Sequence, residues 1–249
     1  MRRHAIIISN PGTAGTDDYL RGVPIDVQNY KSFLTGPTGG LWQPSEVEEM
    51  RCPRAYDIRR KMDSLLAQDY VFIVFTGHGW HSDDLDSTIL QLCDGQEIDS
   101  AELRLAATKQ TLILDCCRKR SKGPPLTEAR DAMKFAKSGP TINPSECRKY
   151  YDKRIEDCPI GQVIMYSCGI DELSNEDDQR GGFYSYYLLE ASREWVRNST
   201  TDTSGDYSIR SVASAHDAAV PLVERRGLGQ TPHIEKPRTA PYYPFCIVA

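Results

Sequence analysis

Four short apolar runs recur along the chain, separated by longer stretches whose apolar residues repeat at helical spacing. The runs cover residues 5–9, 71–75, 111–114 and 163–167. Their β-branched and aromatic side chains predict strands that are buried on both faces of a parallel sheet. Helices are predicted at 27–34, 54–67, 101–107, 183–196 and 211–223. The alternation predicts an α/β fold, a three-layer α/β/α sandwich whose mainly parallel central sheet has about six strands.

Two of the apolar runs end abruptly in chemically reactive residues. The second run leads into His78, which lies between two glycines, and the third leads into Asp115, Cys116 and Cys117. Because the carboxyl ends of parallel strands meet at one edge of the sheet, the histidine and a thiol are expected to lie close together. This combination predicts the nucleophile pair of a cysteine peptidase. Each residue alone also fits a structural role, the histidine in a turn and both cysteines in the core.

Strand geometry distinguishes the two neighbouring thiols. Side chains alternate between the faces of a strand, so Asp115 and Cys117 share one side while Cys116 points to the other. Cys117 is therefore the predicted nucleophile, and Cys116 is a buried core thiol. Burying the carboxylate of Asp115 without a partner costs several kcal/mol. It therefore either receives a cationic substrate group, arginine in preference to lysine, or caps the following turn.

The composition narrows the classes of partner and the compartment. The chain has 249 residues, 39% of them hydrophobic, and a formal net charge of -5, which argues against nucleic-acid binding. No apolar run approaches the roughly 20 residues that span a bilayer, so we expect no membrane contact and a cytoplasmic location. The eight cysteines have no regular spacing and form no Cys-x-x-Cys pair, which predicts reduced thiols and no metal site.

In combination, the His78 turn and the sequence Asp115-Cys-Cys117-Arg118 resemble the caspase-like cysteine peptidases of clan CD. Caspases carry Gln-Ala before the nucleophile, whereas Asp-x-Cys is the pattern of the paracaspase and metacaspase branch. The resemblance runs from about residue 5 to the C-terminus and is that of a prokaryotic homologue. It implies the caspase-like fold and cleavage after arginine, less well after lysine, in regulated proteolysis such as cell death or defence.

Further motifs agree with this resemblance and imply residue roles. Asp26 resembles the family's first acidic pocket residue, and Asp171 or Glu172 resembles the acid that completes the same substrate-binding pocket. Residues 181–185 resemble the start of the helix that follows, and residues 230–232 resemble the approach to the last strand. Substrates are therefore expected to be proteins or peptides with arginine or lysine at the cleavage site.

The resemblance also implies a mechanism and a division of the single domain. Cys117 attacks the peptide carbonyl as a thiolate, and His78 protonates the departing amine. The backbone N–H groups of Gly79 and Cys117 stabilise the oxyanion. The three parts are a large-subunit-like part at 1–118, a linker-like insertion at 119–161 and a small-subunit-like part at 162–249.

Two segments bear on regulation. The insertion at 119–161 is polar and rich in arginine and lysine, with only weak helical stretches such as 127–136. It is either a site of self-cleavage by an arginine-directed peptidase or a solvated surface loop. Asp83, Asp84 and Asp86 make calcium a candidate activator, as in metacaspases, but they lack the ordered spacing of an EF-hand loop and also fit a solvated loop. No other cofactor is expected.

Two other functions are compatible with the sequence. One is a catalytically silent caspase-like protein that binds peptides or scaffolds a complex. The other is a different clan CD peptidase, such as a legumain-like or gingipain-like enzyme, with another specificity. Dimerisation and an upstream activator are compatible with all of these functions.

Overall fold

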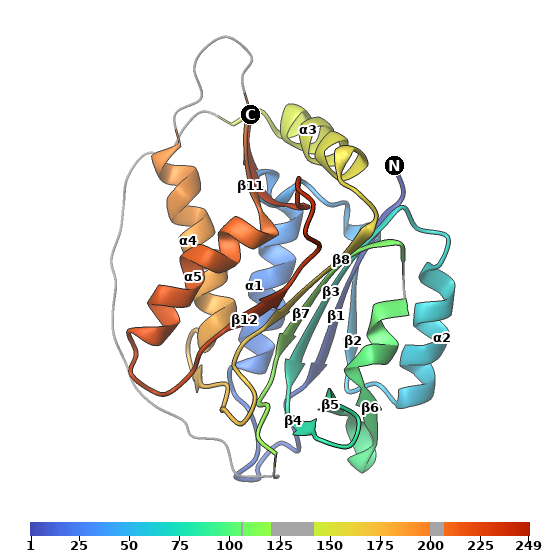
Figure 1. Cartoon of the computed structure of the whole chain (residues 1–249), viewed down its shortest axis with the longest axis vertical. Coiled ribbons are helices and arrows are strands. Elements are labelled where there is room, and N and C mark those ends of the chain that lie inside the picture. Colours follow the sequence, from blue (N-terminus) through green and yellow to red (C-terminus); the bar gives the residue numbers. More distant parts are fainter. Residues whose placement is uncertain (106, 121–141, 200–206) are drawn as a thin grey trace.

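A six-stranded sheet forms the centre of the computed structural model, which describes residues 1–105, 107–120, 142–199 and 207–249 (Figure 1). The strand order is β12-β8-β7-β3-β1-β2. All neighbouring strands are parallel except β12, which runs antiparallel to β8. The six strands are β1 (Arg3–Asn10), β2 (Val47–Arg51), β3 (Tyr70–Gly77), β7 (Lys109–Asp115), β8 (Gly161–Tyr166) and β12 (His233–Glu235). The predicted mainly parallel α/β fold is confirmed.

Helices cover both faces of this sheet and complete the three layers (Figure 1). One face carries α1 (Val23–Thr35), α4 (Phe183–Asn198) and α5 (Val212–Glu224). The other face carries α2 (Ala55–Leu65) and the 3-10 helix η4 (Ser100–Leu105). Beside η4 lies a small antiparallel sheet of β4 (Gly79–Ser82), β5 (Ser87–Gln91) and β6 (Glu97–Asp99).

The remaining elements are short, apart from one helix. They are η1 (Pro37–Gly39), η2 (Pro44–Glu46), η3 (Cys93–Gly95), α3 (Pro144–Asp157), β9 (Glu176–Asp177), β10 (Gly181–Gly182), β11 (Ser208–Ser211) and β13 (Pro244–Val248). No helix among the described residues is long and apolar enough to cross a membrane.

Burial on both faces explains why the strands read as continuous apolar runs. All eight residues of β3 are buried. Phe72 and Val74 belong to the core cluster that contains α1 and α4, whereas Ile73 and Phe75 belong to the cluster that contains α2. Each strand therefore supplies apolar side chains to two cores at once, and this leaves its carboxyl end as the place where polar residues emerge.

The predicted helices at 27–34, 54–67, 183–196 and 211–223 are present, as α1, α2, α4 and α5. Of the segment predicted as a helix at 101–107, residues 101–105 belong to the 3-10 helix η4 instead. The pattern did not predict β2, because this strand lies at the edge of the sheet and none of its residues is fully buried.

Part of the polar insertion is an ordered helix, where the sequence predicted only weak helical stretches. Asn143 caps α3 by accepting hydrogen bonds from the N–H groups of Ser145 and Glu146. The helix then buries Cys147, Tyr151 and Ile155, although most of its residues are charged or polar. The weak helical stretch expected at 127–136 lies outside the described residues.

Candidate active site

The carboxyl ends of β3 and β7 lie side by side, because Thr76 of β3 pairs in register with Asp115 of β7. His78 follows β3 and Cys117 follows β7. Both residues line one narrow cavity, and Asp115 lines it with them. The topology thus brings together the two predicted catalytic residues, which are far apart in the chain.

A backbone carbonyl holds the His78 ring. Nε2 of His78 lies 2.6 Å from the carbonyl oxygen of Asp18. Because a carbonyl oxygen only accepts hydrogen bonds, Nε2 carries the proton of the neutral ring. Nδ1 is then the nitrogen that is able to accept a proton, which suits His78 to act as a general base.

The two neighbouring thiols have different surroundings. Cys116 is 2% exposed and belongs to the core cluster that contains α2, whereas Cys117 is partly exposed. The N–H of Ser174 donates a hydrogen bond to Sγ of Cys117 at 3.3 Å, and this sulfur lies 3.7 Å from the carbonyl oxygen of Ser174. Burial raises the pKa of the Cys117 thiol, and the Ser174 N–H opposes this rise because it stabilises the thiolate.

Three buried acids line the same cavity, and each comes from a different element. They are Asp26 in α1, Asp115 in β7 and Glu176 in β9. The carboxylate of Asp26 accepts a hydrogen bond from the Thr76 hydroxyl at 2.9 Å and another from the N–H of Gly182 at 3.1 Å. The acids are thus held by neutral donors on neighbouring elements.

Asp115 is the most heavily bonded of the three acids. Its carboxylate accepts hydrogen bonds from the hydroxyl groups of Ser174 and Ser185, at 2.7 and 2.5 Å, and from the N–H of Ser185 at 3.1 Å. A Cβ atom at Gly182 would lie 2.5 Å from one of its oxygens. Only glycine therefore allows the chain to pass this close to the carboxylate.

No cation compensates the charge of these acids within the described part of the chain, since none of them forms an ion pair there with Arg, Lys or His. Burial, together with the negative charge of Asp115, raises the pKa of Asp26. Burial also raises the pKa of Glu176 to about 7, against the opposing N–H groups of Gly22 and Arg21. Oε1 of Glu176 is buried and has no hydrogen-bond partner among the described residues. The cavity is therefore suited to a cation.

The cavity is narrow. Its volume is about 20 Å³, which is enough for about one water molecule. Leu20, Ser174 and Glu176 are among the residues that line it.

Comparison with known proteins identifies the family. A model of the caspase domain matches residues 2–243. The chain belongs to the caspase family. Among solved structures, caspase-1 from Spodoptera frugiperda has the same fold, with 13% sequence identity, a TM-score of 0.58, and coverage of 94% of this chain and 86% of that chain. The comparison with curated proteins found no match.

Membership of the caspase family makes this chain a cysteine-type peptidase, a hydrolase of the caspase-like clan. Protein substrates follow from that membership. The expected resemblance to caspase-like peptidases is thus confirmed over nearly the whole chain. The paracaspase or metacaspase branch and the specificity for arginine are finer assignments that the comparisons leave open.

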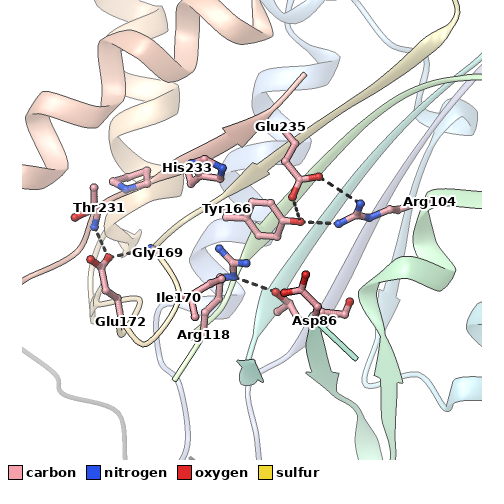
Figure 2. A pocket seen from close by; sticks show the side chains of 13 residues that line it. Asp86, Arg104, Arg118, Tyr166, Gly169, Ile170, Glu172, Thr231, His233 and Glu235 are labelled. Carbon is pink, nitrogen blue, oxygen red and sulfur yellow. Dashed lines mark hydrogen bonds and ion pairs between the residues drawn. The ribbon is translucent and has the colours of Figure 1, made fainter. Parts of the chain in front are cut away.

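The structure does not bring Asp171 or Glu172 to the cavity of this caspase-family chain, so the sequence-based expectation for the third acid differs from the observed geometry. The N–H of Asp171 donates to the carbonyl oxygen of Arg118 at 2.9 Å. The carboxylate of Glu172 accepts hydrogen bonds from the N–H groups of Gly169 and Thr231, at 2.9 and 2.7 Å. Glu172 thereby lines a different pocket, shown in Figure 2.

That second pocket has a volume of about 690 Å³. The side chain of Arg118 points into it and stacks over the ring of Tyr166, with 4.0 Å between the guanidinium carbon and the ring centroid (Figure 2). Tyr166 in turn donates to Glu235 and accepts from Arg104, at 2.8 and 2.6 Å. Arg118 therefore points away from the catalytic cavity, although it directly follows Cys117.

Glu176 is the acid that the sequence pattern did not select. The segment between β8 and α4 contains acids at 171, 172, 176, 177 and 178. A loop of this length gives no periodic signal that shows which acid turns inward. The one available cue was the pair of glycines at 181 and 182, because their close approach to Asp26 and Asp115 brings the preceding residues of the loop to the same cavity.

The remaining sequence-based expectations concern the oxyanion and calcium. Gly79 begins β4, and a Cβ atom there would lie 2.7 Å from Sγ of Cys116. Its role as an oxyanion donor stays a prediction. Asp83 forms an ion pair with Arg120 at 3.0 Å, and a cation at this carboxylate does not fit a calcium site. The described residues contain no group of three or more side chains placed to hold a metal ion. Calcium activation stays a prediction.

Proposed function

We propose that this caspase-family chain is an endopeptidase that cleaves peptide bonds after arginine and, less efficiently, after lysine. One observation carries the proposal. Asp26, Asp115 and Glu176 are buried around a single cavity beside Cys117, and none of them has a cationic partner among the described residues. A substrate guanidinium would supply the missing charge.

The planar guanidinium group suits this arrangement better than an ammonium group. Arginine presents five N–H donors in a rigid fork, so it is able to bond to two or three carboxylates that converge from different directions. Lysine has a compact charge and fewer donors, so we expect it to bind more weakly. An aspartate side chain would meet three carboxylates of the same charge and would be repelled.

The mechanism follows from the groups beside the cavity. His78 accepts the proton of the Cys117 thiol at Nδ1, and the thiolate attacks the carbonyl carbon after the substrate arginine. The protonated ring then gives this proton to the departing amine, and an acyl-enzyme is left. Water hydrolyses the thioester with His78 as base, and this restores the thiol. Backbone N–H groups of Gly79 and Cys117 are the proposed donors to the oxyanion.

Fluorogenic peptides that differ only in the residue before the cut test this function. The purified chain is expected to hydrolyse the arginine peptide fastest, the lysine peptide more slowly and the aspartate peptide not at all. Cys117→Ala is expected to abolish hydrolysis. The matched control is Cys116→Ala, which removes the neighbouring core thiol and is expected to retain activity in its folded fraction. Preference for the aspartate peptide, or full activity of Cys117→Ala, would contradict the proposal.

Regulated proteolysis, in cell death or defence, is the proposed setting. Self-cleavage in the insertion belongs to this proposal, and the position of α3 restricts it. Arg148, Lys149 and Arg154 lie within a packed helix, where an extended substrate conformation is not accessible without unfolding. Cleavage is therefore expected before residue 142. Intact masses of the active chain and of Cys117→Ala check this, and two uncut chains whose masses differ only by the sulfur atom of the substitution would exclude self-cleavage.

A further inference from the structure

Residues 174–176 form one wall of the catalytic cavity, and this 174–176 wall contacts both the nucleophile and the acids. The N–H of Ser174 donates to Sγ of Cys117, while its hydroxyl donates to Asp115 at 2.7 Å. Two residues further on, Glu176 places its own carboxylate at the cavity. A small displacement of this wall would therefore change the nucleophile and the acidic pocket together.

One buried side chain holds the wall from behind. Gln230 is 3% exposed. Its Oε1 accepts hydrogen bonds from the backbone N–H and the side-chain amide of Asn175, both at 3.1 Å. Its Nε2 donates to the carbonyl oxygen of Ser167 at 2.9 Å and to the hydroxyl of Ser174 at 3.3 Å. Gln230 thus ties the wall to the residue that follows β8.

These contacts require both halves of a carboxamide. Oε1 must accept and Nε2 must donate, so an ionised glutamate would lose both donated bonds and a methionine would lose all four. The backbone reinforces the same position, because the carbonyl oxygen of Asn175 accepts from the N–H of Phe183 at 2.9 Å. Buried polar groups that lose their partners cost free energy, so the wall is expected to shift when Gln230 is replaced.

We propose that Gln230 is a positioning residue for catalysis, which holds the 174–176 wall so that Ser174 bonds to the Cys117 sulfur and to Asp115. The part that concerns arginine binding rests on the proposed function. The part that concerns the sulfur does not, because it is a property of the free chain. Gln230 itself does not line the cavity, so it acts through Ser174 and Asn175.

The test uses Gln230→Met with Gln110→Met as the matched control. Gln110 is also a fully buried glutamine, with its Nε2 donating to the carbonyl oxygen of Leu103 at 2.6 Å, but it lies at the opposite end of β7 from Asp115. Both variants lose a buried amide and are expected to lose stability. Only Gln230→Met is expected to change the cavity.

Two readouts are taken on each folded variant. The first is the rate of Cys117 alkylation by iodoacetamide against pH, followed by mass spectrometry of the Cys117 peptide. Its midpoint is expected to move to higher pH in Gln230→Met, because the thiolate loses the Ser174 N–H. The charged or titratable groups near this thiol are unchanged in Gln230→Met; they are His78, Asp115, Cys116, Lys119, Cys168 and Glu176. The second readout is kcat/KM on the arginine peptide, expected to fall about 100-fold.

Further variants keep the test decisive if Gln230→Met fails to fold. Gln230→Glu keeps the acceptor and the size of the side chain. The pH midpoint of Cys117 alkylation is also expected to rise in this variant. Ser174→Ala removes the hydroxyl but keeps the N–H, so the arginine KM is expected to rise while the midpoint stays where it is. An unchanged midpoint and kcat/KM in Gln230→Met or Gln230→Glu would overturn the inference. A wild-type chain without arginine hydrolysis would overturn the proposed function alone, since the alkylation shift would still be measurable.

Discussion

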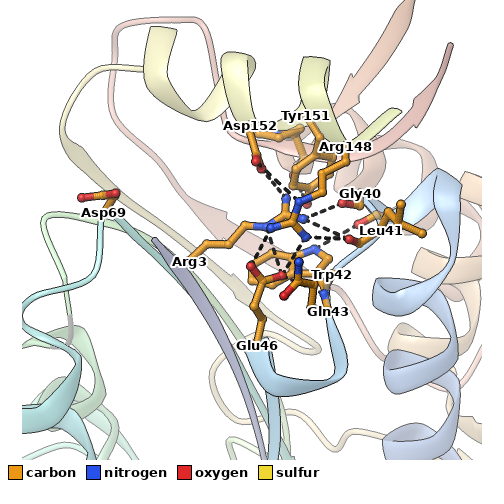
Figure 3. A network of polar contacts seen from close by, with 12 residues as sticks. Arg3, Gly40, Leu41, Trp42, Gln43, Glu46, Asp69, Arg148, Tyr151 and Asp152 are labelled. Atoms are coloured by element: carbon orange, nitrogen blue, oxygen red, sulfur yellow. Dashed lines mark hydrogen bonds and ion pairs between the residues drawn. The ribbon is translucent and has the colours of Figure 1, made fainter. Parts of the chain in front are cut away.

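The molecule contains two buried clusters of charged residues, at opposite ends of its central sheet, and they differ in how charge is compensated. At the amino end of β1, Arg3 has a fully buried side chain. Its Nη1 forms an ion pair with Asp152 at 2.7 Å, and its Nη2 donates to the carbonyl oxygen of Gly40 at 2.6 Å (Figure 3). The guanidinium also stacks over Trp42, with 4.4 Å to the ring centroid. At the carboxyl end, the three acids of the cavity have no such partner among the residues that the structure describes.

The Arg3 cluster is also balanced in number. Arg148 pairs with Glu46 at 2.6 Å, and Glu46 lies 3.7 Å from Nε of Arg3 (Figure 3). Two cations thus face two carboxylates. Arg148 and Asp152 belong to α3, whereas Arg3 belongs to β1 and Glu46 to η2. This cluster joins α3 to β1 and needs no ligand.

The contrast separates a structural cluster from a binding site. Burying a charge costs free energy in either place, and only an opposite charge or several hydrogen bonds offsets it. The Arg3 cluster contains its opposite charges within the fold. In the proposed function, a substrate guanidinium supplies the opposite charge for the cavity acids, which is the arrangement expected where stability is given up for binding. Removal of a charge is therefore predicted to lower the free energy of unfolding at the Arg3 cluster but not at the cavity acids.

The largest effect is expected for Arg3→Met. This substitution removes the buried guanidinium and leaves the partly buried carboxylates of Asp152 and Glu46 with one cation fewer, so the free energy of unfolding is expected to fall by about 3–5 kcal/mol. Urea unfolding measures this change. Arg2→Met is the matched control, because Arg2 is the neighbouring residue and its side chain is 67% exposed. If both variants lost the same free energy of unfolding, burial of Arg3 would not matter for stability. The contrast between the Arg3 cluster and the cavity acids would then fail.

Next in size is the effect of Glu176→Gln on catalysis. Loss of one carboxylate that pairs with the substrate guanidinium is expected to lower kcat/KM for the arginine peptide by about 100-fold or more. At pH 8 the free energy of unfolding is expected not to fall, since a desolvated charge has been removed. Glu172→Gln is the matched control, because Glu172 lies in the other pocket, and it is expected to change kcat/KM by about twofold at most. A larger effect of Glu172→Gln than of Glu176→Gln would place the third acid at 172.

The sequence was sufficient for the features that depend on short-range geometry. Strand alternation predicted that Cys116 is a buried core thiol, and this residue is 2% exposed and packs in the core cluster that contains α2. The strands of the sheet interior were predicted for a similar reason, since each is apolar on both faces. The three residues of β12 and the charged sequence of β2 carry too little apolar pattern to predict an edge strand.

Features that depend on distant contacts were beyond the sequence pattern. Glu176 reaches Asp115 only through a long loop whose path is fixed by Gln230 and by the start of α4. The charged residues of α3 predict a solvated segment, yet Asp152 of that helix is only partly exposed and forms an ion pair with the buried side chain of Arg3. In both cases the deciding partner lies more than 50 residues away along the chain.

A pH dependence of about tenfold is expected from the same acid. The pKa of Glu176 is raised to about 7 from its ordinary value of 4.5, and the guanidinium binds the ionised form. KM for the arginine peptide is therefore expected to fall about tenfold between roughly pH 6 and 8. Stability has the opposite sign, because a raised pKa means that the folded state holds the proton more tightly. This contribution is complete below pH 4.5 and is lost as the pH rises through about 7. Glu176→Gln should remove both trends, and an unchanged KM profile in that variant would assign the titration to another group.

The smallest effect is expected where a pair is compensated but not buried. Arg59 in α2 donates to Glu102 in η4 at 2.9 Å, and their side chains are 53% and 33% exposed. Water already solvates both groups, so Arg59→Met is expected to change the free energy of unfolding by only about 0–1 kcal/mol, and less at high salt. Urea unfolding at low and high salt measures it. If Arg59→Met lowered the free energy of unfolding as much as Arg3→Met, the contribution of an ion pair to stability would depend only on the presence of a partner. We instead predict a larger loss for Arg3→Met, because water is excluded from the Arg3 side chain. Exclusion of water is the property that Arg3 shares with the cavity acids.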